Sequence, residues 1–344
     1  MDHVRPFLAE PDGGQRLPRK VSDWKPARFF PETYPGSCPE HSYLLLDDDV
    51  YPLESVHPLR MRVATPDGLL LLDEVLSRLG LPNVRKRYPV LAYGANRNPA
   101  TLRLKILTYE SQSAGKPVVM PLIRASVADA DVVAGGLYGQ GYFYADLLRR
   151  PEFTSGTSTN VWVALPDISQ LRAIHDSEGV RAGLYSVRRC EGVSVPGYSG
   201  AVAPLAYFSR KSPILSPVFK SPIAFREVTS TGRKIVAMSA LEMMSHVIGA
   251  FDLGGSISTI SGLIEDQTLP FELAKYLNGQ WWYHFHTGNE PISGYRRILT
   301  LFDEAVSKMS GIVVESAPDV PDQMIPPDLA YSETLEFTAE ALFT

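Results

Sequence analysis

Two short segments hold the residue types from which a catalytic site can be built. Residues 91–99 read Leu-Ala-Tyr-Gly-Ala-Asn-Arg-Asn-Pro, and residues 175–185 read His-Asp-Ser-Glu-Gly-Val-Arg-Ala-Gly-Leu-Tyr. In the first segment an apolar run meets Gly, Asn and Pro, which predicts a strand, a tight turn and then a helix. The second segment places the carboxylate of Glu178 beside Gly179, with Tyr185 further along. One segment offers a backbone turn, and the other offers an acid or base.

The turn at residues 93–96 can act through its backbone. Gly94 and Asn96 are residue types that tolerate left-handed backbone conformations. A turn of that kind at the start of a helix points consecutive N–H groups at one spot, where an anion or a developing oxyanion can bind. The same sequence is also a common way to turn a strand into a helix with no chemistry attached. The segment alone leaves both interpretations open.

Glu178 is the candidate for proton transfer. A single positioned carboxylate can take a proton from one nitrogen and give it to another, acting as base and then as acid. The neighbours His175, Asp176 and Arg181 suit a solvated surface equally well, and Asp176 is a competing carboxylate.

In this order and at this spacing, the two segments resemble the γ-glutamyl cyclotransferase family, whose hallmarks are a Tyr-Gly-Ser-Asn loop and a downstream Glu-Gly segment. The resemblance covers roughly residues 88–250. It selects Glu178 over Asp176 as the catalytic acid and base. The substrate-binding residues that it implies are Tyr93, Gly94, Ala95, Asn96, Tyr185 and Phe219.

The resemblance implies an enzyme that releases 5-oxoproline from a γ-glutamyl compound. The α-amine of the substrate attacks its own γ-carbonyl, so the nucleophile is already tethered and the reaction needs no metal, nucleotide or other cofactor. The expected partner is a small γ-glutamyl substrate, which is an amino acid derivative, an amine derivative, or a γ-glutamyl group on a larger molecule.

Two departures from the family pattern keep other functions open. Ala95 stands where the family usually has Ser, and Phe219 stands where a Tyr is expected. A non-catalytic member of the fold that binds a small anionic ligand or a partner protein is therefore the alternative. An enzyme acting on another amide, such as an acyltransferase, would need a nucleophile that the motifs do not offer. A buried Glu178 within reach of the turn would favour catalysis, and an exposed, remote one would favour binding.

The remaining patterns predict an α+β fold, with a mixed β-barrel core, flanking helices and a helical C-terminal extension. Residues 69–79 have helical spacing between Gly68 and Gly80, and Asp167 is expected to cap a short helix. Short strands are expected at residues 88–93, 118–120, 130–134, 142–145, 160–165, 184–189 and 201–209, and helices at 239–251, 270–284 and 293–309. The predicted divisions are an N-terminal arm and helix (1–87), the cyclotransferase-like domain (88–250), a helical extension (251–310) and an acidic tail (311–344).

Composition and the N-terminal sequence bear on the partners, the metal or disulfide sites and the location that we expect. The net charge of −5 predicts no nucleic-acid or anionic-membrane partner, and no apolar run approaches the length that spans a bilayer. Only Cys38 and Cys190 are present, so neither a disulfide scaffold nor a cysteine zinc site is expected. His284 and His286 fit an aromatic helix end better than a metal site, and we expect no metal. The N-terminal residues lack a signal-peptide pattern, so we expect a cytoplasmic protein. The oligomeric state and the role of the acidic tail stay open.

Overall fold

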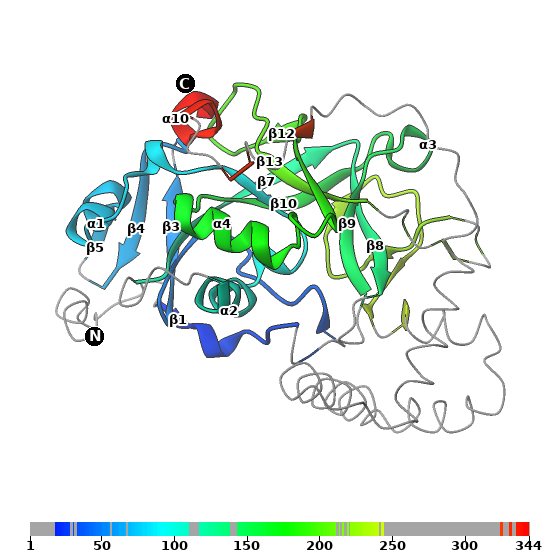
Figure 1. The fold of residues 1–344 in the computed structure, drawn as a ribbon, viewed down its shortest axis with the longest axis horizontal. Coiled ribbons are helices and arrows are strands. Elements are labelled where there is room, and N and C mark those ends of the chain that lie inside the picture. The colour runs from blue at the N-terminus through cyan, green and yellow to red at the C-terminus, as the bar shows by residue number, and fades with distance from the viewer. Residues whose placement is uncertain are drawn as a thin grey trace.

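The structure is a computed structural model, and the fold is α+β with large sheets and few helices (Figure 1). It describes residues 18–27, 30, 33–55, 57–66, 68–109, 117–137, 143–210, 213, 215–216, 219, 221–240, 242–243, 324–325, 330–331 and 335–343. Within these residues, no helix has the length and apolar character needed to cross a membrane.

The main sheet forms one long hydrogen-bonded path. In order the path runs through β17 (Met324–Ile325), β11 (Tyr185–Arg189), β13 (Leu205–Ser209), β6 (Val90–Ala92), β10 (Ser158–Ala164), β7 (Val119–Ala128), β2 (Tyr43–Leu46), β3 (Asp49–Ser55), β4 (Met61–Thr65) and β5 (Gly68–Leu71). Three short strands join it from the side: β1 (Arg19–Lys20) at β3, β12 (Val193–Ser194) at β7 and β15 (Ser230–Thr231) at β10. Among the described strands this path does not close on itself, so the predicted barrel core is not confirmed.

A smaller sheet packs beside the first and consists of β16 (Ala237–Met238), β14 (Ala224–Phe225), β8 (Asp131–Leu137) and β9 (Phe143–Leu148). The buried carboxylate of Asp131, at the start of β8, pairs with Arg233 at 2.7 Å and accepts a hydrogen bond from Ser230 at 3.0 Å. This ion pair ties β8 to the turn that follows β15.

The core lies on both faces of the main sheet, as β7 shows. Its odd-numbered residues Val119 and Ile123 belong to one apolar cluster, and its even-numbered residues Met120 and Leu122 belong to another. Side chains that alternate along a strand point to opposite faces. A strand buried on both faces is apolar throughout, so it lacks the alternation of apolar and polar residues that predicts a strand. For that reason the sequence pattern predicted only a short part of β7.

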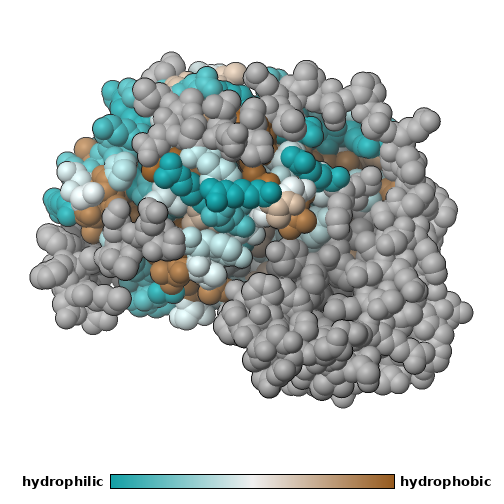
Figure 2. All heavy atoms as spheres, in the orientation of Figure 1, coloured by the Kyte–Doolittle hydropathy of each residue, from teal (hydrophilic) through white to brown (hydrophobic). Residues whose placement is uncertain are grey.

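The helices are short and lie mostly at the sheet edges or on one face. They are α1 (Leu72–Arg78), α2 (Pro99–Tyr109), α3 (Pro151–Thr154), α4 (Ile168–Ser177) and α10 (Ala339–Phe343), with 3-10 helices η2 (Val21–Asp23), η4 (Val84–Lys86), η5 (Ala95–Arg97) and η7 (Leu335–Phe337). Helices α2 and α4 pack against each other in front of the main sheet (Figure 1). The outer surface over α4 is mainly hydrophilic (Figure 2).

Several predicted elements are confirmed in place. Strands are found at or next to each predicted run between residues 88 and 209, and Asp167 caps α4 by accepting the Gln170 N–H at 3.0 Å. The predicted helix over 69–79 is wrong at its start, because Leu69 and Leu71 belong to β5 and only residues 72–78 are helical. The exposed side chains of these two leucines alternate with Leu70, which pairs with Val63 of β4.

Residues 43–71 belong to the main sheet, because β2 pairs with β7 along four residues of each strand. The predicted domain division at residue 88 remains a prediction, and the sheet continues across it. The predicted helices 270–284 and 293–309, and nearly all of 239–251, lie outside the described residues. So do His284 and His286.

The described part of the acidic tail packs against the domain. Strand β17 pairs with β11, and the side chains of Phe337 and Phe343 are buried. Phe343 meets the ring of Tyr198 edge to face, with centroids 5.5 Å apart. These segments of the tail therefore lie over the surface of the core, which was one of the two open interpretations of its composition.

Candidate active site

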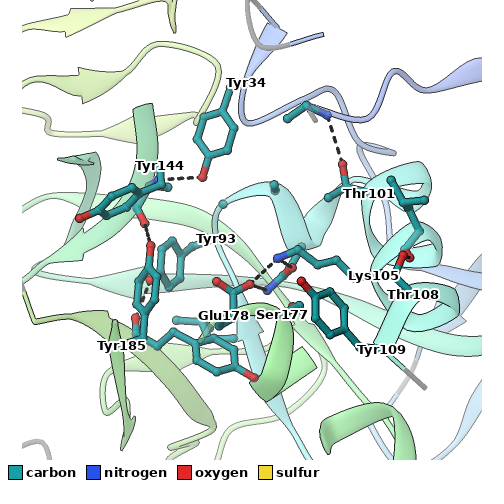
Figure 3. A pocket seen from close by; sticks show the side chains of 18 residues that line it. Tyr34, Tyr93, Thr101, Lys105, Thr108, Tyr109, Tyr144, Ser177, Glu178 and Tyr185 are labelled. Carbon is teal, nitrogen blue, oxygen red and sulfur yellow. Dashed lines mark hydrogen bonds and ion pairs between the residues drawn. The ribbon is translucent and has the colours of Figure 1, made fainter. Parts of the chain in front are cut away.

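The loop between β6 and α2 forms one wall of a cavity of about 110 Å³, and Tyr93, Gly94, Ala95 and Asn96 all line it (Figure 3). The expected strand, turn and helix are present. The expected left-handed conformation is not, because Gly94 has φ −97° and ψ −138° and Asn96 lies in the right-handed 3-10 helix η5. A Cβ atom on Gly94 would lie 3.0 Å from the Cβ of Ala145 and 3.2 Å from the Tyr34 hydroxyl. Close packing, rather than a left-handed backbone, is what favours glycine at this position.

Glu178 enters the same cavity from the end of α4. It is the C-cap of that helix, which ends at once because Gly179 has φ +64°. The Glu178 Oε1 atom accepts a hydrogen bond from Asn96 Nδ2 at 2.9 Å and lies 2.5 Å from Lys105 Nζ (Figure 3). The side chain of Glu178 is 15% exposed and that of Lys105 is 21% exposed. The structure therefore brings the predicted acid and the predicted loop into direct contact.

Lys105 completes a three-residue group. Its Nζ atom also donates to Asn96 Oδ1 at 2.8 Å, so Asn96 bridges the ammonium and the carboxylate. Sequence reasoning missed this lysine. A usable pattern was present, because Thr101, Leu104, Lys105 and Thr108 follow helical spacing along α2 and all line the cavity.

Tyrosines form much of the remaining wall. Among the predicted residues, Tyr93 donates its hydroxyl to the Tyr207 carbonyl and Tyr185 donates to the Ala145 carbonyl at 3.1 Å. Burial raises the pKa of both phenols, so both stay protonated. They shape the cavity, while their hydroxyls are held by the backbone. The tyrosines at the wall that sequence reasoning missed are Tyr34, Tyr109, Tyr144 and Tyr207.

Two other candidate residues lie elsewhere. Phe219 is 47% exposed and is not part of the cavity wall. Asp176, the competing carboxylate, faces the tail: it accepts a hydrogen bond from the Tyr331 hydroxyl at 2.9 Å and lies 3.8 Å from Arg181. Of the two carboxylates in the second segment, only Glu178 lines the cavity.

A buried histidine links the tail to the floor of the site. His175 Nε2 lies 3.0 Å from the Ala330 carbonyl, and its Nδ1 lies 2.9 Å from the Tyr207 hydroxyl. A carbonyl can only accept, so Nε2 carries the proton and Nδ1 accepts from Tyr207. Burial lowers the pKa of His175 to about 4, which keeps the ring neutral in this role. The tail thereby holds the last turn of α4, from which Glu178 projects.

Asp146, next to the cavity residue Ala145, gives a prediction about pH. Its Oδ1 atom accepts hydrogen bonds from the backbone N–H groups of Ser209 and Leu147, and burial raises the pKa of the carboxyl to about 6. The unfolded value is about 4. Between these values the folded protein holds a proton that the unfolded chain has lost, so this group's contribution to the free energy of unfolding falls as pH rises from about 4 to about 6.

We expect Asp146→Asn to be more stable than the wild type above pH 6, by a margin on the order of 3 kcal/mol that shrinks toward pH 4. The amide oxygen can accept the same two N–H groups, and it has no charge to bury. Urea unfolding of both proteins at several pH values from 4 to 8 measures the margin. A margin that did not change with pH would contradict the assignment.

The described residues offer no cluster of three or more His, Cys, Asp or Glu side chains that could hold a metal ion. The polar side chains that line the cavity are a carboxylate, an ammonium, an amide, phenols and the hydroxyls of Thr101, Thr108 and Ser177. Such a set can bind a small zwitterion and move protons.

Similar chains are found among solved structures. No protein-family model matches the chain, and no curated protein matches it. Among solved structures, an uncharacterized protein from Homo sapiens is similar with 15% identity and a TM-score of 0.28, covering 62% of this chain and 99% of its own. A γ-glutamyl cyclotransferase is similar with 14% identity and a TM-score of 0.27, covering 62% of this chain and 98% of its own. The structures similar to this chain thus include a γ-glutamyl cyclotransferase.

Proposed function

We propose that this protein is an enzyme of the γ-glutamyl cyclotransferase type, which releases 5-oxoproline and an amine from a γ-glutamyl compound. The observation that carries the proposal is the position of Glu178, whose carboxylate lies in the cavity 2.9 Å from the amide of Asn96 in the Tyr93–Asn96 loop. A carboxylate in that place can reach a substrate held against the loop.

The ion pair in the cavity matches the head group of the substrate. A γ-glutamyl compound carries an α-ammonium and an α-carboxylate on one carbon atom. Glu178 can bind the ammonium, and Lys105 can bind the carboxylate, because the two charges lie 2.5 Å apart at the cavity and each can exchange its present partner for the substrate. Asn96 can hydrogen-bond to either group through its two ends.

The proton transfers balance with one carboxylate. The α-nitrogen starts with three protons and ends as a lactam N–H, so it loses two, and the departing nitrogen gains two to leave as an ammonium ion. Glu178 takes each proton from the attacking nitrogen and delivers it to the departing nitrogen, and it ends ionised as it began. The new bond joins the α-nitrogen to the γ-carbon, and the bond from that carbon to the departing nitrogen breaks.

The remaining features of the proposal rest on composition and motifs. They include a small γ-glutamyl substrate, no cofactor, no nucleic-acid or membrane partner, and a cytoplasmic location. The alternative, a binding member of the same fold, gains support from Ala95 in the loop. The contact of Glu178 with the loop favours catalysis over that alternative.

The test is direct. The purified protein is incubated with γ-glutamyl amino acids and amines, and 5-oxoproline is measured by mass spectrometry. N-acetylated versions of the same compounds serve as controls, because their nitrogen cannot attack. Product from the free compounds alone supports the proposal. Saturable binding of them without product, measured by calorimetry, would instead favour the binding protein.

A further inference from the structure

Tyr34 enters the cavity from a part of the chain that the family resemblance does not cover. It precedes β2, and only 5% of its surface is exposed. Its ring packs on Phe225 with centroids 5.2 Å apart, which fixes the ring in the apolar core. In the view of Figure 3 the Tyr34 ring lies at the top with its hydroxyl pointing down, and Glu178 lies below it.

The oxygen of Tyr34 lies at the edge of the Tyr93–Asn96 loop. It accepts a hydrogen bond from the Ala145 N–H at 2.7 Å. It is also the atom that a Cβ on Gly94 would approach to 3.2 Å. The Tyr34 hydroxyl therefore lies against the Tyr93–Asn96 loop, in which Ala95 has no side-chain hydroxyl.

We infer that Tyr34 is a catalytic residue, whose O–H donates a hydrogen bond to the γ-carbonyl oxygen and stabilises the negative charge that develops there. The inference rests on the proposed function. Ala95 lacks a side-chain donor at this point of the loop, and Tyr34 supplies one from elsewhere in the chain. A donor fixed in advance at a developing oxyanion is a large contribution to catalysis.

Two features indicate that Tyr34 acts as a hydrogen-bond donor, and does not merely fill the cavity until substrate displaces it. The ring is held in the core, so its oxygen keeps its place when substrate binds. The Ala145 N–H donates to the phenol oxygen, which polarises its O–H bond and strengthens it as a donor. Burial raises the pKa of Tyr34, so the hydroxyl keeps its proton and transfers none.

The test is the Tyr34→Phe variant, for which we expect kcat to fall by roughly 10²-fold while KM changes little. Tyr51→Phe is the matched control, because Tyr51 is a buried core tyrosine that does not line the cavity. Ala95→Ser in the Tyr34→Phe background places a hydroxyl beside the lost one and should recover part of kcat. If Tyr34 had only a structural role, Ala95→Ser would not recover kcat in the Tyr34→Phe background.

The outcomes separate the two proposals. If the wild type releases no 5-oxoproline, the proposed function fails and this inference fails with it. If the wild type is active and Tyr34→Phe keeps its kcat, the inference fails and the function stands. A rise in kcat would mean that the Tyr34 hydroxyl obstructs substrate in the cavity, and the inference would fail. If Tyr34→Phe does not fold, incorporation of 3-fluorotyrosine at position 34 retains the hydroxyl but makes it more acidic, and an unchanged kcat would then overturn the inference.

Discussion

Glu178→Gln is expected to lose 5-oxoproline formation, with kcat lower by roughly 10²- to 10⁴-fold and KM changed far less. The substitution keeps the size of the side chain and an oxygen that can accept from Asn96 and Lys105, as Glu178 Oε1 does now. It removes the only group in the proposed mechanism that accepts and returns the protons. Binding is expected to survive in large part, because the glutamine oxygen can still accept a hydrogen bond from the substrate ammonium and Lys105 still binds the α-carboxylate, whereas proton transfer is lost.

Asp176→Asn is the matched control for this loss. Asp176 lies two residues earlier on α4, and its carboxylate contacts Tyr331 and Arg181 rather than the cavity. We expect this variant to keep near wild-type activity. Initial rates of 5-oxoproline release for both variants, with a thermal melt of each, give the comparison. Comparable turnover by Glu178→Gln and the wild type would remove Glu178 from the mechanism.

The parts of the fold that follow from local patterns were predictable. The apolar run before Gly94 and Pro99 gives β6, the turn and α2, and Asp167 with Gln170 gives the start of α4. Each of these depends on residues a few positions apart, where backbone preferences and capping act directly. The reason given for Gly94 was wrong, because the nearby Ala145 and Tyr34 decide its role and neither is close in sequence.

The parts that depend on distant residues were not predictable in the same way. Strand β2 is apolar throughout because both faces are buried, and without alternation it gave no strand pattern. Asn96 and Glu178 meet across 82 positions of sequence, and only the family resemblance linked them. Tyr34 had no motif to mark it. The helical spacing around Lys105 places it on one face of α2 with Thr101, Leu104 and Thr108, but only the packing of α2, α4 and the sheet makes that face a wall of the cavity.

Lys105→Met is expected to lower kcat/KM for γ-glutamyl compounds by about 10²-fold or more, chiefly by raising KM. Methionine has a similar length and no charge, so it fills the space and removes the ammonium that we assign to the substrate α-carboxylate. Arg103→Met is the matched control: it removes a cation from the same helix, and that cation faces Asp48 at 2.9 Å instead of the cavity.

The decisive comparison uses a substrate without the α-carboxylate. A 4-aminobutanoyl amide has the same tethered amine and would release 2-pyrrolidinone by the same attack. If Lys105 binds the carboxylate, removing that group costs the wild type about as much in kcat/KM as Lys105→Met does. It then costs the Lys105→Met enzyme little, because the two changes delete the same interaction. Equal penalties in both enzymes would mean that Lys105 acts on Glu178 alone, and the carboxylate must then bind another part of the cavity.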